Sequence, residues 1–194
     1  ACGVTAGATM AASLSLSMVV YAWAIRAFFA RRGRLPAAMR LLTAAGALAG
    51  VCQIAALIAS RPKWGLATLG ILFHAAGLLL FAWVLTSVPR RGLLIAHSHE
   101  LGDGIKTGGP FAIFRHPCYA AYSLTWLGAC VARPHPATIV PACVMITWYV
   151  LLARAEERRL MSSTLASVYA RYRERVTWFG PNPIARRRVP VGQQ

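Results

Sequence analysis

The chain has 194 residues, of which 57% are hydrophobic and only 13% are charged, and its mean hydropathy is +0.53. Since a typical soluble domain has about 25% charged residues, this composition excludes a disordered chain and argues against a water-soluble globule. The formal net charge is +16, with 21 Lys and Arg against 5 Asp and Glu. Nucleic-acid binders of such charge are polar and carry a clustered basic patch, so we expect no nucleic-acid partner here.

The five cysteines give no sign of a metal site. They stand at Cys2, Cys52, Cys118, Cys130 and Cys143, with no CxxC pair and no Cys/His spacing typical of zinc ligands. Most lie in apolar stretches, where cysteine acts as a small hydrophobic residue. We therefore predict neither a bound metal nor a disulfide framework.

Five apolar stretches are candidates for membrane spans, because about 20 apolar residues cross a hydrocarbon core of about 30 Å. They cover residues 6–29, 41–60, 64–89, 117–132 and 134–153. The fourth has only 16 uncharged residues, but its pairing with the fifth favours a hairpin of two spans. The sequence predicts an all-α integral membrane protein with five transmembrane helices plus a C-terminal amphipathic helix.

The chain divides into an N-terminal part, residues 1–89, with three transmembrane helices, and residues 90–194, which hold a Gly-rich interval, the hairpin and the tail. In the tail, apolar residues recur with helical spacing at Leu160, Met161, Leu165, Val168, Tyr169 and Tyr172. Arginines fall largely between them. This pattern predicts one amphipathic helix that lies on the membrane or packs over the bundle.

The basic residues indicate which side each end of the chain occupies. Alternating segments between the five spans hold 18 Lys and Arg on one side and 3 on the other. Positively charged loops stay in the cytoplasm. We therefore expect the N-terminus outside, and the Gly-rich interval and the C-terminal tail on the cytoplasmic side.

Two polar clusters meet if spans four and five form a hairpin. Arg115, His116 and Tyr119 stand at the start of one span, and Glu156 and Glu157 stand just after the other. Two of only five carboxylates are adjacent here, so a functional role is favoured over general solvation, although an ion-pair network that closes the hairpin is the structural alternative. Glycines, a helix N-terminus, aromatic rings and carboxylates together suit a zwitterionic nucleoside cofactor.

The order of motifs is specific. It runs Arg115-His116-Pro117-x-Tyr119, an apolar span, Glu156-Glu157, Tyr169-x-x-Tyr172 and Arg175-Val176. Over about residues 95–185 the chain thereby resembles the isoprenylcysteine carboxyl methyltransferase family, whose wider relatives are the membrane phospholipid N-methyltransferases and the sterol reductases. The resemblance implies S-adenosylmethionine as methyl donor, held on the cytoplasmic side.

The resemblance also implies roles for particular residues. The cofactor would contact Asp103, Gly104, Ile105, Lys106, Phe111, His116, Pro117, Cys118, Tyr119 and Glu157. Arg154, Glu156 and Glu157 are the implied catalytic residues, with Arg154 as the match to an arginine that contacts the substrate carboxyl group. The chain departs from the family pattern at Phe111, often Tyr, and at Ala121, usually Gly.

The expected reaction is an in-line displacement in which the carboxylate of a lipid-modified, prenylated cysteine takes the methyl group. A C-terminal carboxylate is ionised at pH 7, so no base is needed, and an arginine can hold it by a bidentate contact. The lipidated substrate would enter sideways from the bilayer, among the membrane lipids. The residues do not indicate an oligomeric state.

Three alternatives remain open. An amine methyltransferase acting on a phospholipid headgroup would share the cofactor site but needs a base, for which His116, His97, His99 or a glutamate could serve. An NADPH-dependent double-bond reductase would use basic residues for the 2′-phosphate. A membrane scaffold or transporter subunit would bind no cofactor.

Overall fold

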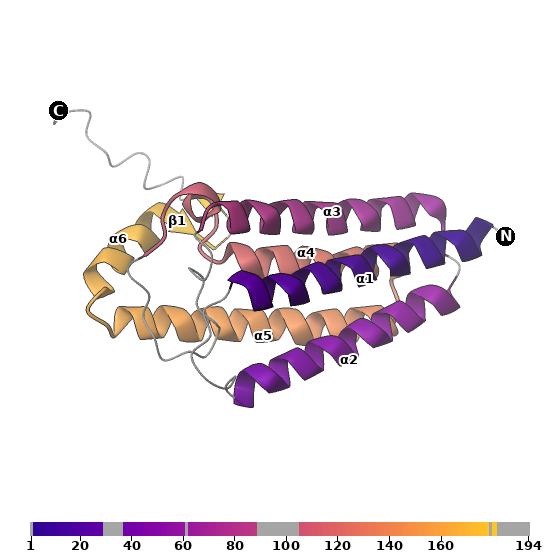
Figure 1. Cartoon of the computed structure of the whole chain (residues 1–194), viewed down its shortest axis with the longest axis horizontal. Coiled ribbons are helices and arrows are strands. Elements are labelled where there is room, and N and C mark those ends of the chain that lie inside the picture. The colour runs from indigo at the N-terminus through magenta and orange to yellow at the C-terminus, as the bar shows by residue number, and fades with distance from the viewer. Residues whose placement is uncertain (1, 29–36, 61, 89–104, 179, 182–194) are drawn as a thin grey trace.

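The computed structural model describes residues 2–28, 37–60, 62–88, 105–178 and 180–181. Five long helices lie side by side in an antiparallel bundle, and a short helix covers one end (Figure 1). The elements are α1 (Cys2–Phe28), α2 (Ala37–Ala59), α3 (Trp64–Thr86), the 3-10 helix η1 (Gly109–Ala112), α4 (Pro117–Ala132), α5 (Pro136–Met161), α6 (Ala166–Arg175), β1 (Val176–Thr177) and β2 (Gly180–Pro181).

Four of the helices, α1, α2, α3 and α5, are long and apolar enough to cross a membrane. These helices agree with the prediction of a helical integral membrane protein and correspond to four of the five predicted spans, so the predicted count of five is not confirmed. The fifth, α4, has 16 residues and lies inside the bundle against α3 and α5. Its Ala121, Trp126 and Ala129 are almost fully buried, so its environment is mainly protein.

Small residues bring α3 and α4 together. A Cβ atom added at Gly77 would lie 2.8 Å from the carbonyl oxygen of Ala121, and one added at Gly70 would lie 2.6 Å from that of Gly128. Such close approach of backbones is how helices in membranes gain packing energy. His74, also on α3, is buried, with its Nδ1 2.8 Å from the Ser13 hydroxyl, which fits a structural role in this packing.

The end of α5 and the tail differ from the sequence prediction. Helix α5 does not end at Ala153 but continues through both glutamates to Met161. The hydroxyls of Ser162 and Ser163 then donate to the carbonyls of Arg158 and Leu160, at 3.0 and 2.7 Å, and the chain turns before α6 begins. The predicted single amphipathic helix is therefore broken, because serine side chains compete for the backbone groups that would continue it.

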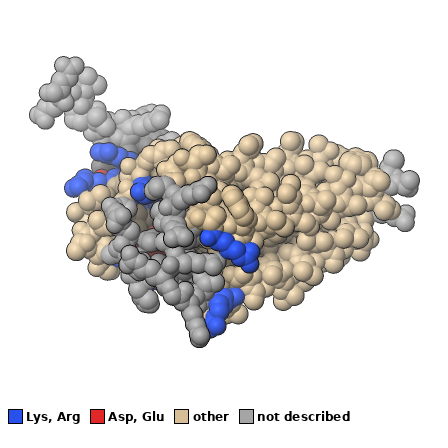
Figure 2. All heavy atoms as spheres, in the orientation of Figure 1, with Lys and Arg blue, Asp and Glu red and all other residues tan. Residues whose placement is uncertain are grey.

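Helix α6 is amphipathic: Tyr169 and Tyr172 are buried, and Arg171 and Arg173 are exposed. After it, β1 and β2 pair antiparallel, with Thr177 opposite Gly180. This two-residue ladder is the one departure from an all-α fold in the described part. On the face shown in Figure 2, Lys and Arg gather toward the end that carries α6, whereas the opposite half of the surface is uncharged.

Because α3 and α4 are in such close contact, the substitution Gly77→Ala should destabilise the protein. The added methyl group overpacks the interface, which typically costs about 1–3 kcal/mol, so the melting temperature of the detergent-solubilised protein should fall. The matched control is Gly65→Ala on the same helix, where no atom lies within 4 Å of the added Cβ. Equal melting temperatures for the two variants would contradict this account.

Candidate functional site

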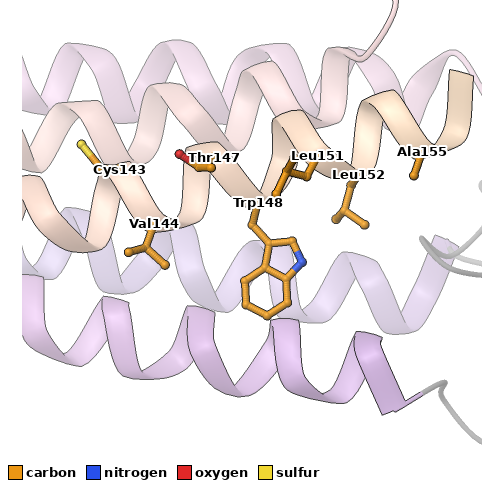
Figure 3. A pocket seen from close by; sticks show the side chains of 7 residues that line it. All are labelled: Cys143, Val144, Thr147, Trp148, Leu151, Leu152 and Ala155. Atoms are coloured by element: carbon orange, nitrogen blue, oxygen red, sulfur yellow. The ribbon is translucent and has the colours of Figure 1, made fainter.

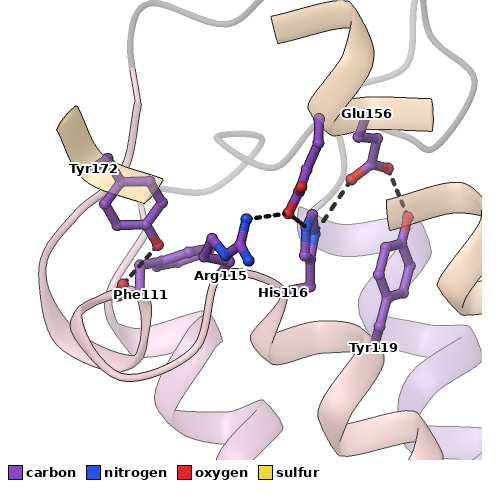
Figure 4. A network of polar contacts seen from close by, with 7 residues as sticks. Phe111, Arg115, His116, Tyr119, Glu156 and Tyr172 are labelled. Atoms are coloured by element: carbon purple, nitrogen blue, oxygen red, sulfur yellow. Dashed lines mark hydrogen bonds and ion pairs between the residues drawn. The ribbon is translucent and has the colours of Figure 1, made fainter. Parts of the chain in front are cut away.

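The candidate site lies at the end of the bundle where α4 begins and α5 ends, beneath α6 (Figures 1 and 4). The chain enters it through η1, where Gly109 has φ +59°, a conformation that suits glycine. Pro117 then starts α4 at its first position, which a proline favours because no N–H is needed there. The residues just before it, Arg115 and His116, are thereby held in non-helical backbone that faces α5.

Glu157 is enclosed by two cationic or hydrogen-bonding partners. Its Oε1 accepts a hydrogen bond from Arg115 Nη1 at 2.7 Å and one from His116 Nε2 at 3.1 Å. The side chains of Arg115 and Glu157 are each only 12% exposed. A charge-assisted pair at this depth joins the start of α4 to the end of α5.

Glu156 is more open. Its side chain is 34% exposed, its Oε1 accepts a hydrogen bond from the Tyr119 hydroxyl at 2.6 Å, and its Oε2 lies 3.7 Å from His116 Nδ1. Figure 4 shows His116 and Tyr119 pointing toward this carboxylate from α4. Of the two glutamates, Glu157 is thus paired with Arg115, and Glu156 is the more exposed.

Helix α6 closes the other side of the site. The Tyr172 hydroxyl donates to the carbonyl oxygen of Phe111 at 2.6 Å, and burial raises the pKa of Tyr172 to about 12. Burial and the Glu157 carboxylate raise the pKa of Tyr169 well above its ordinary value of 10.0, so both phenols stay protonated. Within the described part of the chain, the Tyr169 hydroxyl and Arg115 Nε are buried without a hydrogen-bond partner.

Trp178 also covers the site. It lies in the turn between β1 and β2, with its ring centre 5.8 Å from the Arg115 guanidinium carbon and 5.8 Å from the His116 ring centre. The guanidinium therefore lies between an aromatic ring and a carboxylate. Such cation–π contact adds to the ion pair in holding Arg115 in place.

The structure brings together only part of the predicted site. His116, Tyr119, Glu156 and Glu157 lie in one network, which Arg115 joins, and Phe111 contributes its carbonyl.

The other predicted residues that the structure describes make no hydrogen bond or ion pair in this network. Pro117 begins α4, Cys118 packs against the end of α3, Ile105 packs beside Tyr169, and Lys106 is exposed. Arg154 is exposed on α5 and makes no hydrogen bond or ion pair with the described residues. Asp103 and Gly104 lie outside the described residues.

Sequence reasoning did not assign Tyr169 or Trp178 to the site. Tyr169 was placed on the apolar face of a surface helix, and its register against Arg115 depends on the break after Met161. Trp178 carried one usable signal: it is a large aromatic residue in an otherwise basic tail, two positions beyond Val176.

Because the ion pair is enclosed, substitution of Glu157 should destabilise the protein more than substitution of Glu156. Glu157→Gln leaves Arg115 without its carboxylate in a mostly buried position and should lower the free energy of unfolding by about 3 kcal/mol. Glu156→Gln should cost about 1 kcal/mol, because it weakens one hydrogen bond at a more exposed position. Denaturant unfolding in micelles would measure both, and equal losses would contradict the assignment.

The contact between Tyr172 and Phe111 predicts a local effect. Tyr172→Phe removes one hydrogen bond, worth about 1 kcal/mol, and should speed hydrogen exchange in residues 166–175 several-fold. Exchange in α3 should not change. A uniform increase over the whole bundle would instead show that the contact supports the global fold.

The part of the chain that is similar to a known protein family includes most of this network. A family model described as phospholipid methyltransferase matches residues 66–167, more than half of the chain. The match runs from the start of α3 to the start of α6 and includes the polar residues of α4 and α5. Neither the curated proteins nor the solved structures yielded a significant match.

Proposed function

Because the chain belongs to the phospholipid methyltransferase family, an integral membrane group, we propose that it transfers a methyl group from S-adenosylmethionine to the headgroup amine of a membrane phospholipid. The observation that carries the proposal is the different environment of the two glutamates. Glu157 is neutralised by Arg115, and Glu156 presents a carboxylate to the ligand side. An anionic group in that position suits a cationic or amine-bearing substrate.

The residues present fit a methyl donor of this kind. Two buried polar atoms, Arg115 Nε and Tyr169 Oη, have unused hydrogen-bonding capacity within the described part and can serve the polar groups of the donor. His116, Tyr119 and Phe111 are the residues we propose to hold the donor, and Glu156 is kept for the amine. When bound, S-adenosylmethionine supplies an electrophilic methyl group on a sulfonium sulfur that leaves with the C–S electron pair.

An amine substrate requires a proton acceptor. An ammonium nitrogen has no free electron pair, so it must lose a proton before it attacks. Glu156 Oε2 is the acceptor we propose, with His116 Nδ1 3.7 Å away to share the proton. Tyr119, which donates to Oε1 of the same carboxylate, fixes its orientation.

The carboxylate of a prenylated cysteine is a second candidate substrate. Arg154 favours it, because this guanidinium is exposed on α5 one turn before Glu157 and can pair with an anionic group. The motif order shared with isoprenylcysteine carboxyl methyltransferases supports it as well. That reaction needs no base, so it would tolerate loss of the Glu156 carboxylate as a proton acceptor.

We also propose that the site faces the cytoplasm and the N-terminus the outside. The support is the distribution of basic residues, together with the position of the N-terminus at the end of the bundle opposite α6 (Figure 1). The substrate would reach the site from the bilayer and the methyl donor from water.

The test uses full-length protein in nanodiscs with S-adenosylmethionine labelled in its methyl group. We expect label in phosphatidylethanolamine, and at least a 100-fold lower rate with Glu156→Gln, the usual size of a general-base effect. The matched control is Glu174→Gln, an exposed carboxylate on α6, which should keep the wild-type rate. Label in farnesylcysteine alone would select the second candidate.

Calorimetry measures binding of the methyl donor independently of methyl transfer to the acceptor. Micromolar binding of S-adenosylmethionine and S-adenosylhomocysteine, with none of NADPH, is the expected result. Folded protein that binds neither adenosyl compound would overturn the proposal.

A further inference from the structure

The ring of Tyr149 lies on the same side of α5 as Glu156. The two residues are seven positions apart, which is almost two turns of an α-helix. The side chain of Tyr149 is 8% exposed and packs in the core that α2, α4 and α5 share. The Trp126 indole N–H donates to its hydroxyl at 3.1 Å, so the polar end of the ring is paired inside the bundle. Tyr149 thus presents a ring that is held in one orientation.

Tyr119 connects this ring to Glu156. The rings of Tyr119 and Tyr149 are 6° from parallel with their centres 5.6 Å apart, and the Tyr119 hydroxyl donates to Glu156 Oε1 at 2.6 Å (Figure 4). The His116 ring also lies against Tyr119, with 5.8 Å between the ring centres. Because the hydroxyl is at the far end of the phenol, a small rotation of the ring would take it beyond hydrogen-bond distance of the carboxylate. Stacking on Tyr149 opposes that rotation.

A groove lies on the opposite side of α5. It has a volume of about 510 Å³ and is lined by apolar residues of this helix, among them Val144, Trp148, Leu151 and Ala155 (Figure 3). With 3.6 residues per turn, Leu151 is rotated by about 200° from Tyr149 about the helix axis. The groove therefore has no part in orienting the carboxylate, which accepts its hydrogen bond from α4.

We propose that Tyr149 is a positioning residue of the site, whose ring holds the Tyr119 phenol against Glu156 and thereby fixes the direction of the carboxylate. The proposal rests on the proposed function for the task of Glu156 as proton acceptor. A base works only within hydrogen-bond reach of the proton it takes, so a displaced carboxylate slows the reaction. Tyr149 acts through Tyr119, since its own hydroxyl is bonded to Trp126.

The first experiment follows the contact without methyl transfer. A fluorinated tyrosine is placed at position 119 of the full-length protein in nanodiscs, and its fluorine NMR shift is measured with and without Glu156→Gln. The shift should change with Glu156→Gln, because the phenol no longer donates to a carboxylate. In the Tyr149→Leu protein this response should be mostly lost. An undiminished response in Tyr149→Leu would overturn the proposal.

The matched control is Phe81→Leu, which also removes a buried ring from the bundle. Phe81 lies on α3, is 1% exposed and contacts the rings of Tyr21 and Tyr122. Its loss should lower the melting temperature and leave the fluorine response intact. A residue that merely filled the core would behave in the same way, so equal responses in Phe81→Leu and Tyr149→Leu would also contradict the proposal.

The second experiment measures the rate of methyl transfer. Tyr149→Leu should lower it about 10-fold or more, because small displacements in a site are costly, and Tyr149→Phe, which keeps the ring, should stay close to the wild-type rate. Added to Tyr119→Phe, which lacks the hydroxyl through which Tyr149 acts, Tyr149→Leu should cause little further loss. Losses that multiply in the double variant would show an independent structural role and overturn the proposal.

The outcomes separate the two proposals. A fluorine response that depends on Tyr149 in a protein that transfers no methyl group would support the positioning and reject the proposed function. Methyl transfer at the wild-type rate in Tyr149→Leu would reject the positioning alone. If Tyr149→Leu does not fold, Tyr149→Met takes its place, because a flexible methionine fills the space without offering a flat ring.

Discussion

The ion pair between Arg115 and Glu157 is the shortest charged contact between the start of α4 and the end of α5 in the described part of the chain. It ties the non-helical residues before α4 to the last turns of α5, and His116 contacts its carboxylate while Trp178 contacts its guanidinium group. Because both partners are only 12% exposed, the pair is shielded from water and salt. Glu156, whose partners include Tyr119 and His116, is not the glutamate that pairs with this arginine.

The hairpin could be predicted from the sequence, because two helices of known length place residues 115–119 beside residues 156–157, although Arg154, which was expected there too, lies on the exposed side of α5. Which glutamate meets which partner could not, since that depends on the rotation of α5 about its axis. The same limit applies to Trp178, whose place follows from a two-residue strand pair. Hydropathy also stopped α5 at Ala153, although the following Arg, Ala, Glu and Leu residues are good helix formers.

The chain combines two kinds of surface. Along α3 and α4, glycines at positions 70, 77 and 128 allow contact so close that a methyl group would not fit. Along α5, by contrast, large apolar side chains remain exposed, and the polar groups are gathered at one end of the helix. Helices α3 and α4 therefore form the closest-packed part of the bundle, and α5 carries both an exposed apolar surface and the two carboxylates of the site.

The length of α5 sets the depth of the site. Glu156 stands twenty residues beyond Pro136, which is about 30 Å along the helix axis and equals the thickness of the hydrocarbon core. A shorter helix would leave the carboxylates in hydrocarbon, where a charge is costly, and a longer one would lift them out of reach of a lipid. A helix α5 that begins at one edge of the hydrocarbon core would therefore place the carboxylates at its other edge.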